Sequence, residues 1–296
     1  MTRRLLAIHA HPDDESSKGA ATYAYYRSTG AEVMVVSCTG GERGDIQNPG
    51  LEAHAMANRD MGGLRIIEMA DARQLMGIEH RWLGYLDSGL PEEGEVVPAG
   101  AFALIPLEIS AAPLVRIIRE FRPQVVHTYD ESGGYPHPDH IRTHEIAVYA
   151  IEAAADPSRY PDAGPAWTVL KVYYDRIFNP ARLDAVYTRL QETEPDSERT
   201  ANMTELKTWM DERWAGATVT VTTRVPCGDF FDVRDDALRA HASQVPPDSR
   251  FFFWPNDLQR DVWPYEDFEL AQSTVESSIP ETDLFAGVPD ETPVSG

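Results

Sequence analysis

Two short segments contain the residue types that bind catalytic metals. The first is His11-Pro12-Asp13-Asp14-Glu15, and the second is His137-Pro138-Asp139-His140. Imidazole and carboxylate groups together suit zinc or iron(II). A histidine and a carboxylate three positions apart in the first segment can face one point in space, and the second segment offers a third ligand. Two histidines and one carboxylate leave room for water on the metal, as a catalytic site requires.

Such a site would activate water for hydrolysis. Three protein ligands lower the pKa of metal-bound water toward about 7. Neighbouring side chains diverge, so Asp13 is expected beside the metal as the base that accepts a proton from this water, while Asp14 binds the metal. His137 is a candidate donor to the oxyanion of the tetrahedral intermediate. Asp139 is expected to pair with His137 and keep it charged, and Tyr135 offers a further hydroxyl donor.

Strands and helices alternate in the part of the chain that must position these segments. The predicted strands are residues 5–8, 33–36, 80–86 and 125–127, and the predicted helices are residues 16–29, 51–77 (with a break near Gly62-Gly63), 106–121 and 139–155. This alternation is typical of βαβ units and implies a parallel sheet. Ligands bind at the carboxyl ends of strands in such sheets, and both His-rich segments follow a predicted strand.

We therefore expect an α/β fold, with a Rossmann-like, mostly parallel sheet flanked by helices and a smaller, irregular α+β C-terminal part. The expected metal-binding core is residues 1–165, and residues 166–272 are expected to complete the substrate cleft. In that part, the predicted elements are strands at 169–178 and 217–225, a helix at 232–244, and an aromatic run at 251–254 that packs or lines a cleft. Residues 273–296 are expected to form a disordered acidic tail, because few large apolar residues occur there.

The composition restricts the partners. Acidic residues number 48 and basic residues 26, giving a formal charge of −22 that repels nucleic acid and anionic membrane surfaces. No apolar stretch has membrane-spanning length. The two cysteines, Cys38 and Cys227, are far apart in the sequence and do not imply a disulfide framework, and a cytoplasmic location fits. A small-molecule substrate is expected, and a homo-oligomer is left open.

The paired segments resemble the LmbE-like, or PIG-L-like, family of zinc-dependent N-acetylglucosaminyl deacetylases over residues 3–270. This resemblance implies one zinc ion per chain, with iron(II) as the alternative, held by His11, Asp14 and His140. It also implies that Asp13 is the general base and that His137 stabilises the transition state, with Tyr135 assisting at the oxyanion.

Longer matches resemble the mycothiol branch of this family; they are residues 9–19, 39–44, 86–90, 129–137 and 236–244. Two similar enzymes share that branch. One deacetylates N-acetylglucosaminyl-inositol during mycothiol synthesis. The other is an amidase of thiol-based detoxification, which cleaves the amide between an S-substituted cysteine and glucosaminyl-inositol in mycothiol conjugates. Ser16-Ser17-Lys18-Gly19 and the unbroken segment 129–140 resemble the amidase, so the pseudo-disaccharide thiol conjugate is the expected substrate.

Five residues are candidates for contact with that substrate: Lys18, Asp45, Arg65, Asp87 and His241. The resemblance implies the middle three, and sugar hydroxyls do need carboxylate acceptors and a forked arginine donor. Each candidate also has an ordinary structural interpretation, as a helix surface charge, a turn residue or a core histidine. His9 and His127, at strand ends, are expected to pack behind the site.

Two other classes of protein share part of this pattern. Two histidines and a carboxylate also form the facial triad of iron(II) oxygenases. That triad usually occurs on β-barrels, whereas this sequence predicts a parallel sheet, and Asp13 would have no role in oxygen chemistry. A nucleotide-binding module lacks support, because neither a G-x-G-x-x-G nor a Walker A sequence is present and the acidic segment would repel phosphate.

Overall fold

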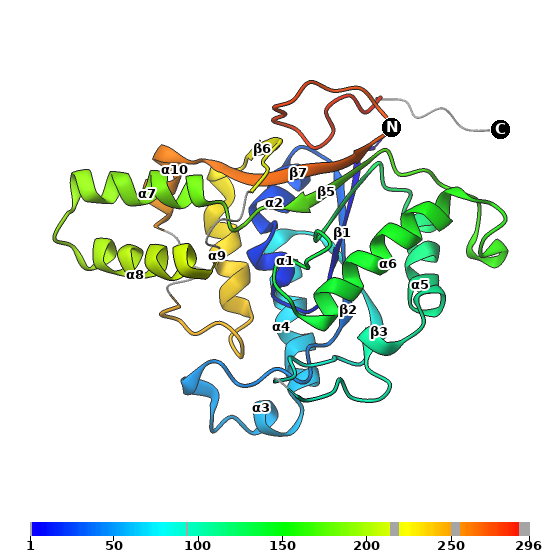
Figure 1. Ribbon diagram of the computed structural model, residues 1–296, viewed down its shortest axis with the longest axis horizontal. Coiled ribbons are helices and arrows are strands. Elements are labelled where there is room, and N and C mark those ends of the chain that lie inside the picture. Colours follow the sequence, from blue (N-terminus) through cyan, green and yellow to red (C-terminus); the bar gives the residue numbers. More distant parts are fainter. Residues whose placement is uncertain (1, 93, 214–218, 250–254, 290–296) are drawn as a thin grey trace.

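Seven strands assemble into one sheet in the computed structural model, which describes residues 2–92, 94–213, 219–249 and 255–289 (Figure 1). The strand order is β3-β2-β1-β4-β5-β7-β6. The strands from β1 to β5 pair in parallel, whereas β7 runs antiparallel to both β5 and β6. The strands are β1 Arg4–His9, β2 Glu32–Thr39, β3 Glu79–Tyr85, β4 Val125–Thr128, β5 Lys171–Asp175, β6 Thr223–Pro226 and β7 Tyr265–Ser273. The α/β prediction is therefore confirmed.

Helices cover both faces of this sheet (Figure 1). The α-helices are α1 Asp14–Ser17, α2 Ala20–Ser28, α3 Ala55–Arg59, α4 Met61–Met76, α5 Leu107–Phe121, α6 Pro138–Ala155, α7 Pro180–Thr193, α8 Glu198–Arg213, α9 Phe231–Ala240 and α10 Asn256–Val262. Short 3-10 helices are Pro49–Leu51, Phe102–Leu104, Pro161–Ala163 and Gly228–Phe230. No described helix is both long and apolar enough to span a membrane.

The central strands serve two hydrophobic cores, because successive side chains of a strand point to opposite faces. Leu5 and Ala7 of β1 pack in the core beneath α2, α4 and α9. Leu6 and Ile8 pack in the core beneath α5 and α6. Both faces of β1 are fully buried, as expected for an interior parallel strand. The sheet is thus a rigid base for the loops at its carboxyl edge.

Two predicted helices are interrupted. The helix expected over 16–29 is divided at Lys18 and Gly19 into α1 and α2. The helix expected over 51–77 is divided at Asp60, not at the glycine pair, because the Asp60 side chain caps α4 by accepting a hydrogen bond from the backbone N–H of Gly63. The aromatic run predicted at 251–254 lies outside the described residues.

The prediction of disorder after residue 272 is wrong for the described part, which ends at residue 289. Glu281 is buried and accepts hydrogen bonds from Lys171 Nζ and from the Tyr173 hydroxyl, both at 2.6 Å. Leu284 and Phe285 are buried in the core beneath α2. The acidic composition suggested disorder, but a buried lysine satisfies one acid and two apolar side chains anchor the segment.

The second half of the chain shares the sheet with the first. It adds β5 beside β4, and then β7 and β6 beyond it. A third small core, built mainly from Leu183, Val186, Leu190, Met203 and Met210, joins α7 to α8 away from the sheet. The loop after α9 returns toward α4, which brings residues 241–245 near the carboxyl edge of β1.

Candidate active site

The first His-rich segment forms the turn between β1 and α1. Asp13 has φ 92° and ψ −28°, a left-handed conformation that is uncommon for a residue other than glycine. Two side chains brace this turn. Asp14 accepts a hydrogen bond from the backbone N–H of His11 at 3.0 Å, and Glu15 accepts one from the backbone N–H of Asp13 at 3.0 Å. Strain at such a position is typical of functional sites.

The second segment begins α6 after the loop that follows β4. His137 caps this helix, because its Nδ1 accepts a hydrogen bond from the backbone N–H of Asp139. Since β1 and β4 are neighbouring parallel strands, the two segments meet at one edge of the sheet. His140, in the first turn of α6, faces His11 with their ring centroids 5.3 Å apart.

Three buried side chains converge with the spacing of metal ligands. Asp14 Oδ2 lies 3.6 Å from His11 Nδ1 and 3.4 Å from His140 Nε2. Ligand atoms placed tetrahedrally at about 2.1 Å from zinc would be about 3.4 Å apart. Within the described residues, a second group with comparable spacing consists of His11, His137 and Asp139.

The hydrogen bonds of the two histidines support the first group. His140 Nδ1 lies 3.0 Å from the carbonyl oxygen of Gly133, so that nitrogen carries the proton and donates it. His140 Nε2 is buried and makes no hydrogen bond within the described part of the chain. His11 Nε2 lies 3.2 Å from Asp139 Oδ2, which leaves Nδ1 free to face Asp14. Each ring therefore directs a lone pair to the same point, and the residues fit a metal ion.

Lys18, a candidate for substrate contact, lies next to this centre. Its Nζ donates to Asp14 Oδ1 at 2.5 Å, and its side chain is nearly buried. Burial alone would lower the pKa of Lys18, but the carboxylate of Asp14 raises it above its usual value. Burial would likewise raise the pKa of Asp14, but His140 and Lys18 hold it well below its usual range. Asp14 is thus an anion with one oxygen held by the lysine.

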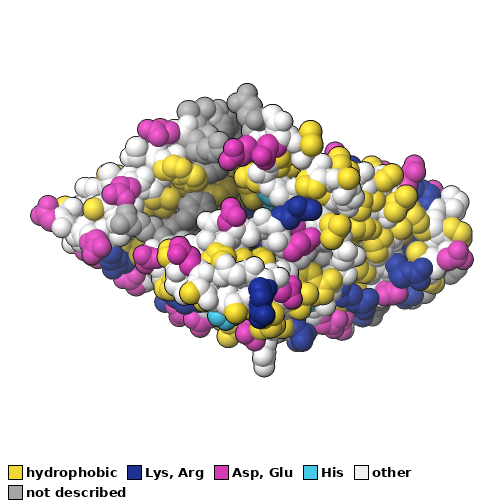
Figure 2. Space-filling view, turned by 90° about the horizontal axis from the view of Figure 1, so that it is seen from below, with side chains coloured by type: hydrophobic (Ala, Val, Ile, Leu, Met, Phe, Trp, Pro, Cys, Tyr) yellow, Lys and Arg dark blue, Asp and Glu magenta, His cyan; other side chains and the backbone are white. Residues whose placement is uncertain are grey.

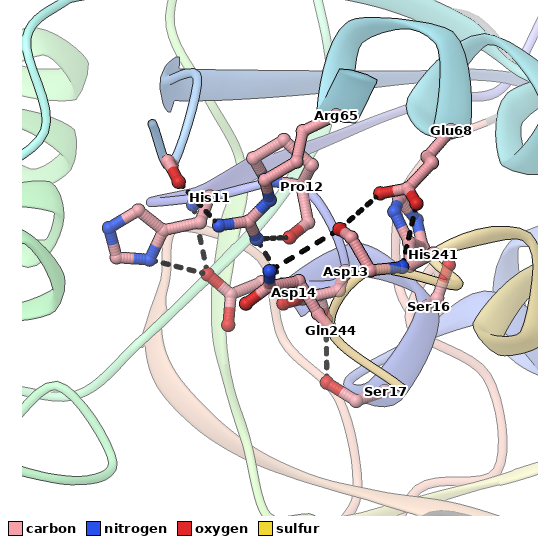
Figure 3. A network of polar contacts seen from close by, with 12 residues as sticks. His11, Pro12, Asp13, Asp14, Ser16, Ser17, Arg65, Glu68, His241 and Gln244 are labelled. Carbon is pink, nitrogen blue, oxygen red and sulfur yellow. Dashed lines mark hydrogen bonds and ion pairs between the residues drawn. The ribbon is translucent and has the colours of Figure 1, made fainter. Parts of the chain in front are cut away.

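Arg65 of α4 holds the turn that carries Asp13 (Figure 3). One guanidinium nitrogen, Nη2, donates to Asp13 Oδ2 at 2.9 Å and to the carbonyl oxygen of Pro12 at 2.5 Å. The other, Nη1, donates to the carbonyl oxygen of Gly41 at 2.8 Å. Arg65 is buried, so its interpretation as an exposed helix charge is excluded.

His241, a candidate for substrate contact, is buried away from the cavity. Its Nε2 lies 2.8 Å from Glu15 Oε1 in a fully buried pair. Nearby, Glu68 accepts hydrogen bonds from the backbone N–H and the hydroxyl of Ser243 at 2.7 Å each. Figure 3 shows Glu68 on the same helix as Arg65, facing the loop of His241 and Gln244. This loop is therefore tied to both α1 and α4.

The expected pairing of Asp139 with a charged His137 differs from the structure. The Asp139 carboxylate instead accepts from His11 Nε2 and, at 2.9 Å, from the backbone N–H of Ser88. Burial, followed by repulsion from His11, lowers the pKa of His137 to about 4, which favours the neutral ring. Because Nδ1 of His137 accepts a hydrogen bond, its proton is on Nε2. A neutral His137 is still a donor.

A cavity of about 310 Å³ adjoins the cluster. Among the predicted residues, Asp13, Asp45, Arg65, Asp87, Tyr135 and His137 line it. Arg43, Gln47 and Gln244 line it too and were not foreseen. They lie in irregular loops, where no sequence pattern indicates the direction of a side chain. Acidic side chains are spread over this side of the molecule, in keeping with the net charge (Figure 2).

Solved structures show where this fold occurs. The N,N'-diacetylchitobiose deacetylase of Pyrococcus horikoshii superposes with a TM-score of 0.61 at 19% identity, covering 90% of this chain and 83% of that one. The 4-carboxy-2-hydroxymuconate hydratase GalB of Pseudomonas putida superposes with a TM-score of 0.60 at 15% identity, covering 94% and 99%. These likenesses concern the fold, which carries different reactions.

Sequence relatives are much more similar. A mycothiol S-conjugate amidase of Streptomyces coelicolor is 50% identical over 294 residues, which is 97% of this chain and 98% of the relative. A 1D-myo-inositol 2-acetamido-2-deoxy-alpha-D-glucopyranoside deacetylase of Streptomyces avermitilis is 40% identical, with 97% of each chain covered. The family model described as PIG-L, GlcNAc-PI de-N-acetylase, matches residues 6–151, which include both His-rich segments. Identity at this level over nearly the whole chain means that the protein is a hydrolase of the PIG-L, or LmbE-like, family.

Proposed function

We propose that this protein is a zinc-dependent amidase of mycothiol S-conjugates. The bond cleaved is the amide between an S-substituted, N-acylated cysteine and glucosaminyl-inositol. The observation that carries the choice of substrate is the 50% identity, over 97% of the chain, to a relative named for this activity. Relatives named as deacetylases of the acetylated amino sugar are 40% and 39% identical.

The proposed ligands are His11, Asp14 and His140, whose donor atoms converge and whose other nitrogen or oxygen atoms already have partners. Bound zinc would act as a Lewis acid and lower the pKa of a coordinated water toward about 7. The protein contributes the arrangement of these side chains before substrate binds. Asp139 and Gly133 orient the two imidazoles, and Lys18 fixes the carboxylate.

Asp13 is the proposed general base. Its carboxylate lines the cavity beside the ligand cluster, and the hydrogen bond from Arg65 fixes one of its oxygens. The left-handed backbone at Asp13 separates its side chain from that of Asp14, so that one carboxylate binds the metal and its neighbour faces the reacting water. After attack on the carbonyl carbon, Asp13 would pass the proton to the leaving amine of the glucosamine.

His137 and Tyr135 are the proposed donors to the oxyanion. The proton on His137 Nε2 is available because its Nδ1 already accepts a hydrogen bond from α6. Both side chains line the cavity, with ring centroids 5.9 Å apart. Burial raises the pKa of Tyr135 to about 12, so its hydroxyl keeps its proton and can donate at neutral pH.

The polar cavity suits the glucosaminyl-inositol portion of the substrate. The backbone N–H of Arg43 donates to Asp87 Oδ2 at 3.0 Å, and Arg43 Nε donates to the backbone oxygen of Asp87 at 2.8 Å, so both residues are held together at the cavity wall. Asp45, Gln47 and Gln244 also line this cavity and add carboxylate and amide groups that can accept or donate hydrogen bonds. We propose Asp45, Asp87 and Arg65 as substrate contacts, with Arg65 also supporting the base.

The test is hydrolysis of two substrates by the same preparation: a bimane conjugate of mycothiol and N-acetylglucosaminyl-inositol. We expect a higher kcat/KM for the conjugate. A hundredfold preference for the acetylated sugar would instead support the second candidate, the biosynthetic deacetylase, which the 40% identical relative favours. Turnover that depends on oxygen would contradict both.

A further inference from the structure

Tyr129 is the first residue after β4, and it touches both ligand-bearing segments from behind. Its ring stacks on that of His140, with centroids 4.5 Å apart and planes inclined by 13°. Its hydroxyl accepts a hydrogen bond from the backbone N–H of Ala10 at 3.0 Å, one residue before His11. Tyr129 is completely buried, and it is not among the residues that line the cavity. It therefore joins the two segments without access to a substrate.

A row of hydrogen-bonded rings fixes the hydroxyl of Tyr129. That hydroxyl lies 3.2 Å from His9 Nδ1, and His9 Nε2 lies 2.9 Å from the Tyr23 hydroxyl. The Tyr23 hydroxyl in turn lies 2.7 Å from His127 Nδ1. All four rings are fully buried.

One assignment of protons accounts for each hydrogen bond of the row and leaves His127 Nε2 as a buried acceptor with no partner in the described part of the chain. His127 Nδ1–H donates to Tyr23, Tyr23 donates to His9 Nε2, and His9 Nδ1–H donates to Tyr129. Each imidazole in this assignment is neutral, with one donor and one acceptor nitrogen. The Tyr129 oxygen then accepts from His9 and from Ala10, and its own proton is donated to the Asp14 side chain.

We propose that Tyr129 is a positioning residue that keeps His11 and His140 at the relative positions needed to bind one metal ion. The inference rests on the ligand set of the proposed function. The stacked ring fixes the plane of the His140 imidazole, whose Nδ1 is held at its edge by Gly133. The hydroxyl fixes the backbone that carries His11. Removing partners of metal ligands typically weakens metal binding by about 10- to 100-fold.

Tyr135 provides a contrast at the same histidine. Its ring centroid also lies 4.5 Å from that of His140, but the planes are inclined by 60° and the side chain lines the cavity. A change at Tyr135 is therefore expected to act on turnover, whereas a change at Tyr129 acts on metal binding. Tyr129 and Tyr135 thus contact the same histidine, the first from the protein interior and the second from the cavity.

The test is the zinc affinity of Tyr129→Phe, which keeps the stacked ring and removes the hydroxyl. The matched control is Tyr173→Phe, because Tyr173 is equally buried and its hydroxyl also makes a short hydrogen bond, at 2.6 Å to Glu281. Tyr173 lies beside His127 in the sheet, but its hydroxyl bonds to the C-terminal segment and not to the row of rings. Zinc dissociation constants come from competition with a chromophoric chelator, and the visible spectrum of the cobalt(II) form reports ligand geometry. We expect binding weakened about 10- to 100-fold and a shifted cobalt spectrum for Tyr129→Phe, with wild-type values for the control.

Tyr23→Phe is the second variant, in case the first does not fold; it breaks the row one step further away and should weaken zinc binding by a smaller factor. Wild-type zinc affinity and cobalt spectrum in Tyr129→Phe would overturn the inference, and so would equal weakening in Tyr173→Phe. A wild-type protein that binds no zinc would instead refute the proposed function, and this inference with it.

Discussion

Replacing Asp13 by asparagine should remove the proposed general base without changing the structure of the site. Asparagine tolerates the left-handed backbone at this position, where φ is 92°. Its amide oxygen can still accept the hydrogen bond that Arg65 Nη2 donates to Asp13 at 2.9 Å. The proposed metal ligands His11 and Asp14 are unchanged in this variant. We expect kcat to fall by about 10²- to 10⁴-fold, the usual contribution of general acid–base catalysis, with full metal content.

Comparing Asp13→Ala with Asp13→Asn separates the effect of backbone strain on stability from the effect of the lost base on turnover. Alanine has no side chain to stabilise a left-handed conformation, which costs roughly 1–2 kcal/mol. It also leaves Arg65 Nη2 without its carboxylate partner. Both variants should lose the same turnover, but Asp13→Ala should in addition unfold at a lower urea concentration than Asp13→Asn.

The assay combines three measurements on each variant: kcat for a bimane conjugate, metal content, and the free energy of unfolding in urea. The role of Asp13 as base is refuted if Asp13→Asn binds metal and keeps more than a tenth of the wild-type kcat. Loss of metal in Asp13→Asn would contradict the placement of Asp13 outside the ligand set.

Three further predictions concern stability. Glu281→Gln leaves buried Lys171 without its carboxylate and should lower the free energy of unfolding by about 3–5 kcal/mol at pH 7. Burial would raise the pKa of Glu281, but Lys171 and its other donors lower it, so the pair stabilises the fold above the unfolded pKa and the difference from wild type should shrink as pH falls through the folded pKa. A difference in urea unfolding that stays constant between pH 7 and pH 3 would contradict this prediction. Phe285→Ala should cost about 3–5 kcal/mol in the same assay, because that ring is buried, and a loss under 1 kcal/mol would mean that the segment is detached. Chelation should lower Tm by about 4 °C at metal concentrations near a hundred times Kd, because about 2.7 kcal/mol of binding is set against an unfolding entropy of about 0.6 kcal/mol/K for 296 residues. An unchanged Tm in calorimetry would argue against a folded-state metal site.

Much of the ligand cluster was predictable because its positions follow from local rules. Apolar runs at residues 5–8 and 125–127 indicate buried parallel strands, and whatever follows them lies at one edge of the sheet. His11 and Asp14 come soon after the first of these strands, and His140 lies in the first turn of the helix beyond the second. Two short apolar runs therefore predict that residues far apart in the sequence lie close together. The same reasoning placed Tyr135 and His137 at the cavity.

The partners of long polar side chains were not predictable in this way. Lys18 and His241 could have faced a substrate, but nearby carboxylates of Asp14 and Glu15 hold them in the protein interior. Sequence spacing does not reveal such pairs, since His241 meets Glu15 across 226 positions of the chain.

Strand β7 was missed for a related reason. Its sequence, Tyr265–Ser273, is rich in acidic and polar residues, yet it lies between β5 and β6. Asp267 is buried there because Asn179 and Trp263 donate to it at 2.8 and 3.0 Å. A hydrophobic pattern cannot identify a strand whose buried acids are satisfied by distant residues.

The proposed hydrolysis depends on one zinc ion held by His11 of the β1–α1 turn, Asp14 of α1 and His140 of α6. The direct measurement is an anomalous difference map, recorded at the zinc absorption edge from a crystal of the zinc-loaded protein. We predict a single peak about 2.0–2.2 Å from His11 Nδ1, Asp14 Oδ2 and His140 Nε2. A peak held instead by His11, His137 and Asp139, or no peak at this edge of the sheet, would contradict the account.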